Sequence, residues 1–256
     1  MNEKLFFLEI GQGKPIICLH GYPLDHTIWL KMSDEIKTRA KLILPDLRGH
    51  GRSPSPDGKY SMRTMAEDVL HLMDTQNLDR AHIAGHSMGG YVALALAEYY
   101  PDRLSGLALV ASHSFEDSPE KKRARIENIE RLNQASVQEV LADMPGKLTR
   151  NPEIVDYCSK LIAQMSKNGL TGVLAGMAER PDRTEVLKAI KNPKIVIAGN
   201  DDQLIPLKTS REMTNLVGNL NFVEIKGAGH MPMMENPIET GYALLKIIES
   251  SEEIIK

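Results

Sequence analysis

The feature that most constrains the fold of this chain is a regular alternation of short apolar runs with amphipathic helical patterns. The apolar runs are continuous, which is typical of strands buried on both faces of a sheet. They lie at 5–10, 15–20, 41–47, 81–87, 104–112, 193–200 and 221–227, and helical patterns lie at 26–38, 61–76, 88–99, 207–217 and 236–249. This order predicts an α/β fold with a mostly parallel, doubly wound sheet covered by helices on both faces.

The alternation stops between residues 115 and 190. No strand pattern occurs there, and the segment contains several charged, amphipathic helical stretches. The strand pattern resumes at Pro193. We therefore expect residues 115–190 to form a helical cap inserted over one end of the sheet, with residues 1–114 and 191–256 forming the core.

Composition excludes several classes of function. The 256 residues carry a formal net charge of −3, which gives no indication of a nucleic-acid partner. Cys18 and Cys158 form no CxxC pair, so a disulfide framework or zinc–thiolate site is not expected. The N-terminal apolar run is too short for a signal peptide, and no stretch reaches the length of a membrane span. We expect a cytoplasmic protein without a membrane partner, and the choice between monomer and homodimer stays open.

The segment "GHSMG" places Ser87 between Gly85 and Gly89, directly after a predicted strand and directly before a predicted helix. A serine on such a sharp turn adopts a strained backbone conformation that projects its hydroxyl above the sheet, and glycines avoid collisions with the neighbouring backbone. The alternative is a purely structural turn. A nucleophilic serine requires a base, so the rest of the sequence must decide between them.

A base and an acid follow later in the chain. His230 lies in the glycine-rich stretch "KGAGHMPMMENP", after the last predicted strand, where parallel sheets carry their active sites. His86 adjoins Ser87 and should point away, His82 lies within a strand, and His50 and His113 lie in other loops. Asp201 and Asp202 follow the strand at 193–200, and either could orient the histidine.

Acyl transfer also requires hydrogen-bond donors for an oxyanion. Met88 follows the serine and offers one backbone N–H. The second donor should come from the loop "HGYPLD" after the strand at 15–20, where we predict the Tyr22 amide because Pro23 has no N–H.

With these motifs in place, the chain resembles the α/β-hydrolase superfamily, in its serine esterase, enol-lactonase and cofactor-free haloperoxidase branch. The resemblance rests on "HGYP", "DLRGHGRS", "GHSMGG", "GNDDQLIP" and "GAGHMPMMENP", in this order. In that family the acid lies in a G-x-x-D-x-x-x-P pattern, which Gly199, Asp202 and Pro206 match. The resemblance therefore implies the triad Ser87, Asp202 and His230, and it implies a structural role for Arg48 and His50.

The resemblance implies a serine hydrolase that cleaves a small or medium carboxylic ester, or a lactone, through an acyl-enzyme on Ser87. Water is the second reactant, and no metal or cofactor is expected. Enol-lactonase and perhydrolase or haloperoxidase chemistry would use the same triad. A member of a different class, a small-molecule receptor with slow or absent turnover, would also fit.

The substrate pocket is expected to be apolar and adaptable, because methionines near the predicted triad and in the cap can line it. The residues predicted to line it are Trp29, Met165, Met177, Leu204 and Met231. Leu161, Ile162 and Leu174 recur at helical spacing in the cap and could face Ser87 as well.

Overall fold

The computed structural model describes residues 3–253 and contains a seven-stranded sheet. The strand order is β1-β3-β2-β4-β5-β6-β7. Strand β1 pairs with β3 in the antiparallel sense, and the other neighbouring strands are parallel. The strands are β1 Phe7–Gly11, β2 Lys14–Leu19, β3 Ala40–Pro45, β4 Ala81–His86, β5 Leu104–Val110, β6 Lys194–Gly199 and β7 Asn221–Ile225. The predicted mostly parallel α/β fold is confirmed.

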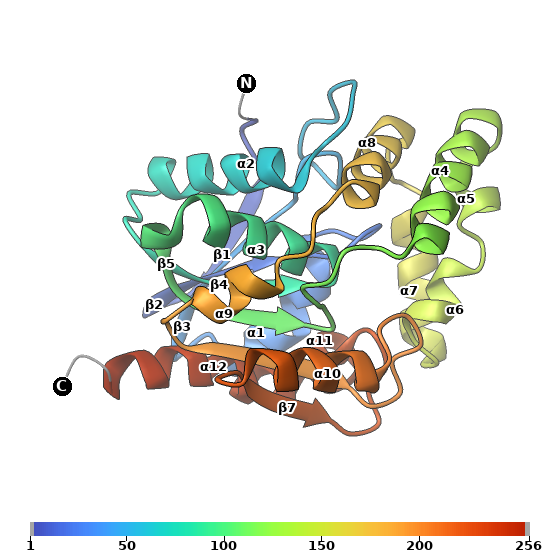
Figure 1. Ribbon diagram of the computed structural model, residues 1–256. Helices are drawn as coiled ribbons and strands as arrows, with labels where there is room; N and C mark the ends of the chain where they lie inside the picture. Colours follow the sequence, from blue (N-terminus) through green and yellow to red (C-terminus); the bar gives the residue numbers. More distant parts are fainter. Residues whose placement is uncertain (1–2, 254–256) are drawn as a thin grey trace.

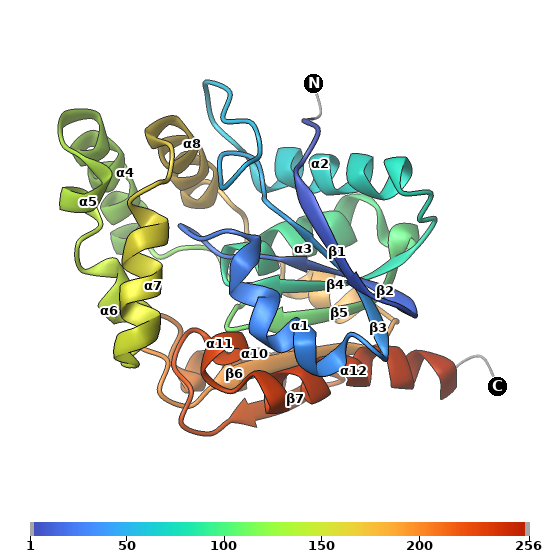
Figure 2. The same cartoon turned by 180° about the vertical axis from the view of Figure 1, so that it is seen from behind.

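Helices cover both faces of the sheet (Figures 1 and 2). Helices α2 (Met62–Thr75) and α3 (Met88–Tyr99) pack together on one face, and α1 (Leu30–Ile36) and α12 (Pro237–Glu253) pack together on the other. Helix α10 (Leu207–Val217) lies against β6 and β7. Every residue of β4 and β6 is buried, as expected for central strands that are covered on both sides.

The helical pattern predicted at 26–38 forms two elements. A 3₁₀ turn, η1 (His26–Trp29), precedes α1, and Asp25 caps it by accepting a hydrogen bond from the Thr27 amide. A second 3₁₀ turn, η2 (Pro101–Arg103), leads into β5, and α11 (Pro232–Glu235) precedes α12. Within residues 3–253, no helix combines the length and the apolar character that crossing a bilayer requires.

Residues 115–190 are helical, and the described part of this segment contains no strand. Its helices are α4 Pro119–Gln134, α5 Val137–Val140, α6 Met144–Leu148, α7 Pro152–Ile162, α8 Lys167–Ala178 and α9 Thr184–Ala189. Helix α4 packs on α8, and α9 packs on α3 and α10. Figures 1 and 2 show α4 to α8 beyond the end of the sheet toward which the β5 arrow points. The parallel strands therefore end beneath these helices.

Candidate active site

Ser87 occupies the turn that joins β4 to α3. Its φ of 49° and ψ of −113° lie in a region that non-glycine residues rarely adopt. The turn is held from both sides, because the Ser87 amide donates to the Val110 carbonyl at 2.9 Å and the Ser112 hydroxyl donates to the Ser87 carbonyl at 2.7 Å. The surrounding structure thus maintains the strained conformation that presents the hydroxyl.

The glycines on either side of Ser87 are required by close backbone approach. A Cβ on Gly85 would lie 2.4 Å from the Gly89 carbonyl oxygen, and a Cβ on Gly89 would lie 2.4 Å from the carbonyl oxygen of Leu19 in β2. Both distances are far below van der Waals contact, so larger residues would force strand, turn and helix apart. The G-x-S-x-G spacing is therefore a packing requirement of this turn.

His230 and Asp202 form a buried pair beside Ser87. His230 Nδ1 donates to Asp202 Oδ2 at 2.7 Å, and each side chain is 1% exposed. The other carboxylate oxygen of Asp202 accepts from the amides of Leu204 (2.8 Å) and Ile205 (2.9 Å), which fixes the acid in place. Because Nδ1 carries the donated proton, neutral His230 presents Nε2 as a proton acceptor.

The two adjacent aspartates have different surroundings. Asp201 is exposed, and its amide donates to the Ala228 carbonyl at 2.9 Å. The residue that reaches the histidine is Asp202, the one selected by the family pattern.

The loop that carries His230 is fastened by Glu235. Its carboxylate accepts from the amides of Gly229 (2.7 Å) and Met231 (3.2 Å) and from the Thr149 hydroxyl (2.5 Å). The His230 amide also donates to the Leu148 carbonyl at 3.0 Å. The histidine loop is therefore tied to the end of α6, in the helical segment 115–190.

The other histidines near the site contact the loops that surround it. His86 points away from the cavity, and its Nε2 donates to the His230 carbonyl at 2.8 Å. Burial holds the pKa of His86 well below its ordinary value, and the adjacent His230 lowers it further. His20 Nε2 accepts from the Leu47 amide, which ties the loop after β2 to the loop after β3. His50 lies edge-on to both His20 and Tyr22 beneath that loop.

Two backbone amides are available to an oxyanion. Tyr22 and Met88 both line the cavity above Ser87. Within residues 3–253, neither amide donates to a protein acceptor. Met88 is the first residue of α3, where helical N–H groups point outward and favour negative charge.

One group of side chains has the spacing of a metal site. Ligand atoms of Asp25, His26 and Asp46 lie within 4.8 Å of one another. His26 Nδ1 already donates to Asp46 at 2.6 Å, and the amides of His26 and Arg52 donate to the same carboxylate. These contacts make His26 and Asp46 a hydrogen-bonded link between two loops.

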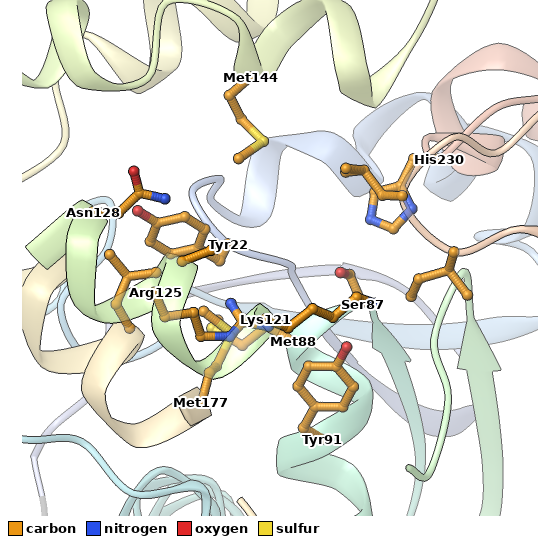
Figure 3. Close-up of a pocket in the computed structure, with 14 residues that line it drawn as sticks. Tyr22, Ser87, Met88, Tyr91, Lys121, Arg125, Asn128, Met144, Met177 and His230 are labelled. Atoms are coloured by element: carbon orange, nitrogen blue, oxygen red, sulfur yellow. The ribbon is translucent and has the colours of Figure 1, made fainter. Parts of the chain in front are cut away.

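An open cavity of about 230 Å³ lies over Ser87 and His230 (Figure 3). Apolar side chains form much of it, and its lysine and arginine both come from α4. Its lining residues are Tyr22, Ser87, Met88, Tyr91, Lys121, Ala124, Arg125, Asn128, Met144, Leu174, Met177, Leu204, Ile205 and His230.

Comparison with known proteins identifies the family. The family model described as the alpha/beta hydrolase fold matches residues 14–149. The chain belongs to the α/β-hydrolase family. It is 31% identical over 241 residues to the AB hydrolase superfamily protein YisY of Bacillus subtilis, covering 90% of this chain and 89% of that protein.

Two further relatives of this α/β-hydrolase carry named activities. A thermophilic esterase from Thermogutta terrifontis, solved with malate bound, is 34% identical with a TM-score of 0.93, covering 97% of this chain and 94% of that chain. The 3-oxoadipate enol-lactonase 2 of Acinetobacter baylyi is 25% identical over 253 residues, covering 97% of this chain and 94% of that protein. The chain therefore matches both proteins over nearly their full length.

The predicted pocket residues of this α/β-hydrolase divide into two groups. Met177 and Leu204 line the cavity, as does Leu174. Trp29, Met165 and Met231 lie outside it, and so do Leu161 and Ile162.

Packing into the core explains why Trp29, Met231 and Met165 do not line the cavity as predicted. Trp29 is fully buried and packs edge-on against His86. Met231 is fully buried although it follows His230, because the short helix α11 begins directly after it and turns the chain into the core. Met165 is 7% exposed and belongs to the apolar core cluster, in the turn between α7 and α8.

The sequence analysis missed part of the cavity wall of this α/β-hydrolase. Tyr91 lies one turn into α3, and Met144 opens α6. Lys121, Arg125 and Asn128 lie on one face of α4 at spacings of four and three residues. Such spacing could have been detected, but a polar stripe on a helix more often faces solvent.

Proposed function

We propose that this α/β-hydrolase is a serine hydrolase that cleaves a carboxylic ester through an acyl-enzyme on Ser87. The observation that carries the proposal is the buried 2.7 Å hydrogen bond from His230 to Asp202, placed beside a serine held at positive φ on the cavity floor. This is the arrangement that a serine nucleophile needs for activation. The similarity to the Thermogutta esterase supports the same chemistry.

The reaction proceeds in two halves. The Ser87 oxygen forms a bond to the acyl carbon, and its proton passes to His230 Nε2. The tetrahedral oxyanion accepts hydrogen bonds from the Tyr22 and Met88 amides. When the intermediate collapses, the bond to the alcohol oxygen breaks and His230 returns the proton to the departing alcohol.

Water completes the cycle. It gives a proton to His230 and bonds to the acyl carbon, and collapse of the second intermediate releases the carboxylic acid and restores the Ser87 hydroxyl. Asp202 keeps the histidine in one tautomer and stabilises the transient imidazolium throughout.

In this proposal residues 115–190 act as a cap. Lys121, Arg125 and Met144 line the cavity from this segment, together with Leu174 and Met177, and none of them belongs to the triad. The cap therefore shapes the acyl pocket and excludes water, while the core residues 1–114 and 191–256 carry the chemistry.

A lactone is the second candidate substrate. The 25% identity to an enol-lactonase over 97% of the chain favours it. The same triad opens a lactone ring, because the leaving oxygen simply stays attached to the acyl group.

We propose a cytoplasmic location. Cys18 and Cys158 are both buried free thiols, which suits a reducing compartment. Burial raises the pKa of the Cys158 thiol to about 12, so this group stays protonated and unreactive.

The test is turnover of 4-nitrophenyl acetate. The wild-type protein should release nitrophenolate in a burst followed by steady turnover, and Ser87→Ala should lower turnover by at least about 10³-fold. Ser159→Ala is the matched control, since this exposed hydroxyl only bonds its own helix at the Val155 carbonyl. Undiminished activity in Ser87→Ala would refute the nucleophile, and a burst without turnover would indicate a receptor.

A further inference from the structure

The cavity above Ser87 has a one-sided charge. The lining of the cavity includes two cationic side chains, Lys121 and Arg125. No aspartate or glutamate lines the cavity among the residues that the structure describes. Both cations come from α4. A cavity with an excess of one charge favours ligands of the opposite charge.

The charge near Arg125 is only partly neutralised. Arg125 Nε donates to Asp117 at 2.5 Å, and Arg180 Nη1 lies 2.8 Å from the same carboxylate. Two guanidinium groups therefore share one buried carboxylate, and this group of three residues keeps a net positive charge. The pair of cations outweighs burial and lowers the pKa of Asp117 to about 2, so the carboxylate stays ionised.

Lys121 adds a second positive charge one helical turn earlier. Among residues 3–253 it has no carboxylate within ion-pair distance, whereas its neighbour Lys122 pairs with Glu116 at 2.6 Å. Burial lowers the pKa of Lys121, the Asp117 carboxylate opposes this, and Arg125 and Arg180 add to the lowering. An anion bound in the cavity would give this ammonium the partner that the protein does not supply.

A buried hydroxyl at the same wall points to a ligand independently. Tyr22 lines this cavity, and its hydroxyl is buried without a hydrogen-bond partner in the described structure. Burial raises the Tyr22 pKa, which keeps the group protonated as a donor. Figure 3 shows this hydroxyl pointing toward Asn128 of α4, on the same side of the cavity as Arg125. A carboxylate oxygen would satisfy a donor that is otherwise costly to bury.

The position of the α4 side of the cavity relative to Ser87 determines which part of the substrate it contacts. The leaving oxygen must lie near His230, which returns its proton, and the oxyanion must face the amides of Tyr22 and Met88. Figure 3 shows Lys121, Arg125 and Asn128 on the side of the cavity away from His230, with Ser87 between. The side opposite the leaving group receives the remainder of the acyl chain.

We propose that the preferred substrates are esters or lactones whose acyl chain ends in a carboxylate, held by Lys121 and Arg125 with the Tyr22 hydroxyl. The acid released would then be a dicarboxylate. This inference rests on the proposed ester hydrolysis at Ser87 and adds the substrate class.

The experiment compares an anionic ester with a neutral ester of matched length. Monoethyl glutarate and ethyl pentanoate differ only at the far end of the acyl chain, and monoethyl succinate and adipate test the length. For the wild type, kcat/KM for the best monoester should exceed that for ethyl pentanoate by about 10-fold, and added NaCl should reduce this ratio.

The variants assign the preference to one side chain. Lys121→Met should lower the anionic-to-neutral ratio by about 10-fold, and Lys121→Arg should retain most of it because it keeps the charge. Lys122→Met is the matched control on the same helix and should leave the ratio unchanged. Lys121 is exposed, so the fold should tolerate its replacement, and thermal unfolding checks this.

Failure of this inference is distinguishable from failure of the proposed function. If Ser87-dependent hydrolysis of ethyl pentanoate exceeds that of every monoester, or if Lys121→Met keeps the ratio, the carboxylate preference is refuted and the esterase stands. If no ester is turned over, calorimetric binding of glutarate tests the anion site independently of hydrolysis. Binding weakened about 10-fold by Lys121→Met supports the anion site, and no binding to the wild type refutes it.

Discussion

The two walls of the cavity are built in different ways. Ser87, Asp202 and His230 stand on turns that follow β4, β6 and β7, and buried hydrogen bonds fix each turn. The opposite wall belongs to the segment 115–190 and combines long, partly exposed side chains of α4, such as Lys121 and Arg125, with buried apolar side chains of α8. The first wall is rigid enough to hold a reaction geometry, and the second can vary without disturbing the sheet. In the proposed function, the chemistry and the choice of substrate therefore depend on separate elements.

The rigid wall should be sensitive to the loss of a single oxygen. Asp202→Asn should lower kcat by roughly 10⁴-fold, because an amide no longer selects the histidine tautomer. Asp201→Asn, one residue away and exposed, is the matched control and should change kcat by less than about 3-fold. Steady-state kinetics on 4-nitrophenyl acetate measures both. Reversed effects would move the acid to Asp201.

The contact between the His230 loop and the segment 115–190 should have an intermediate effect when it is broken. Glu235 accepts hydrogen bonds from the His230 loop and from Thr149 of the segment 115–190, so Glu235→Gln should misplace His230 and lower kcat by about 10-fold. Thr149→Val removes only one of these donors and should lower kcat by about 3-fold.

Measuring kcat together with thermal stability separates a positioning role of Glu235 from a role in stability alone. If the Glu235→Gln protein loses thermal stability but keeps its kcat at a temperature where it is folded, Glu235 serves the fold alone.

Substitutions in the opposite wall should change which acyl-chain length is hydrolysed best. Leu174 and Met177 are each 2% exposed and line the cavity, so their replacement by alanine should shift the optimum among C2 to C10 esters toward longer chains. Ratios between neighbouring chain lengths should change by about 10-fold. The measurement is kcat/KM across the series.

Met165→Ala is the matched control for these variants. Met165 is 7% exposed and lies outside the cavity, so its replacement should cost about 2–5 kcal/mol of stability without changing the profile. If Leu174→Ala and Met177→Ala lower all chain lengths equally, residues 115–190 do not select the acyl chain.

The same contrast explains what the sequence predicted. Ser87 could be predicted because its glycines, strand and helix are adjacent in the chain, and His230 because it follows a strand of a parallel sheet. Two aspartates follow β6, and only the family pattern separated Asp202 from Asp201. Local order and strand ends thus predict most of the fold and bring the proposed catalytic residues to one edge of the sheet.

The pocket depends on contacts that no local pattern contains. The side chain of Met231 turns into the core because α11 begins there, and Trp29 is covered by packing on His86. The charged face of α4 resembled a solvated surface until the structure placed it over Ser87. Long-range packing decides which face of each helix meets the cavity.

The most direct test of the proposed chemistry is the crystal structure of the protein after reaction with an alkyl phosphonate, which mimics the tetrahedral intermediate. We predict a covalent bond from phosphorus to Ser87 Oγ, and a phosphonyl oxygen about 3 Å from the amides of both Tyr22 and Met88. A phosphonate bonded to another residue, or an oxygen remote from both amides, would contradict the account.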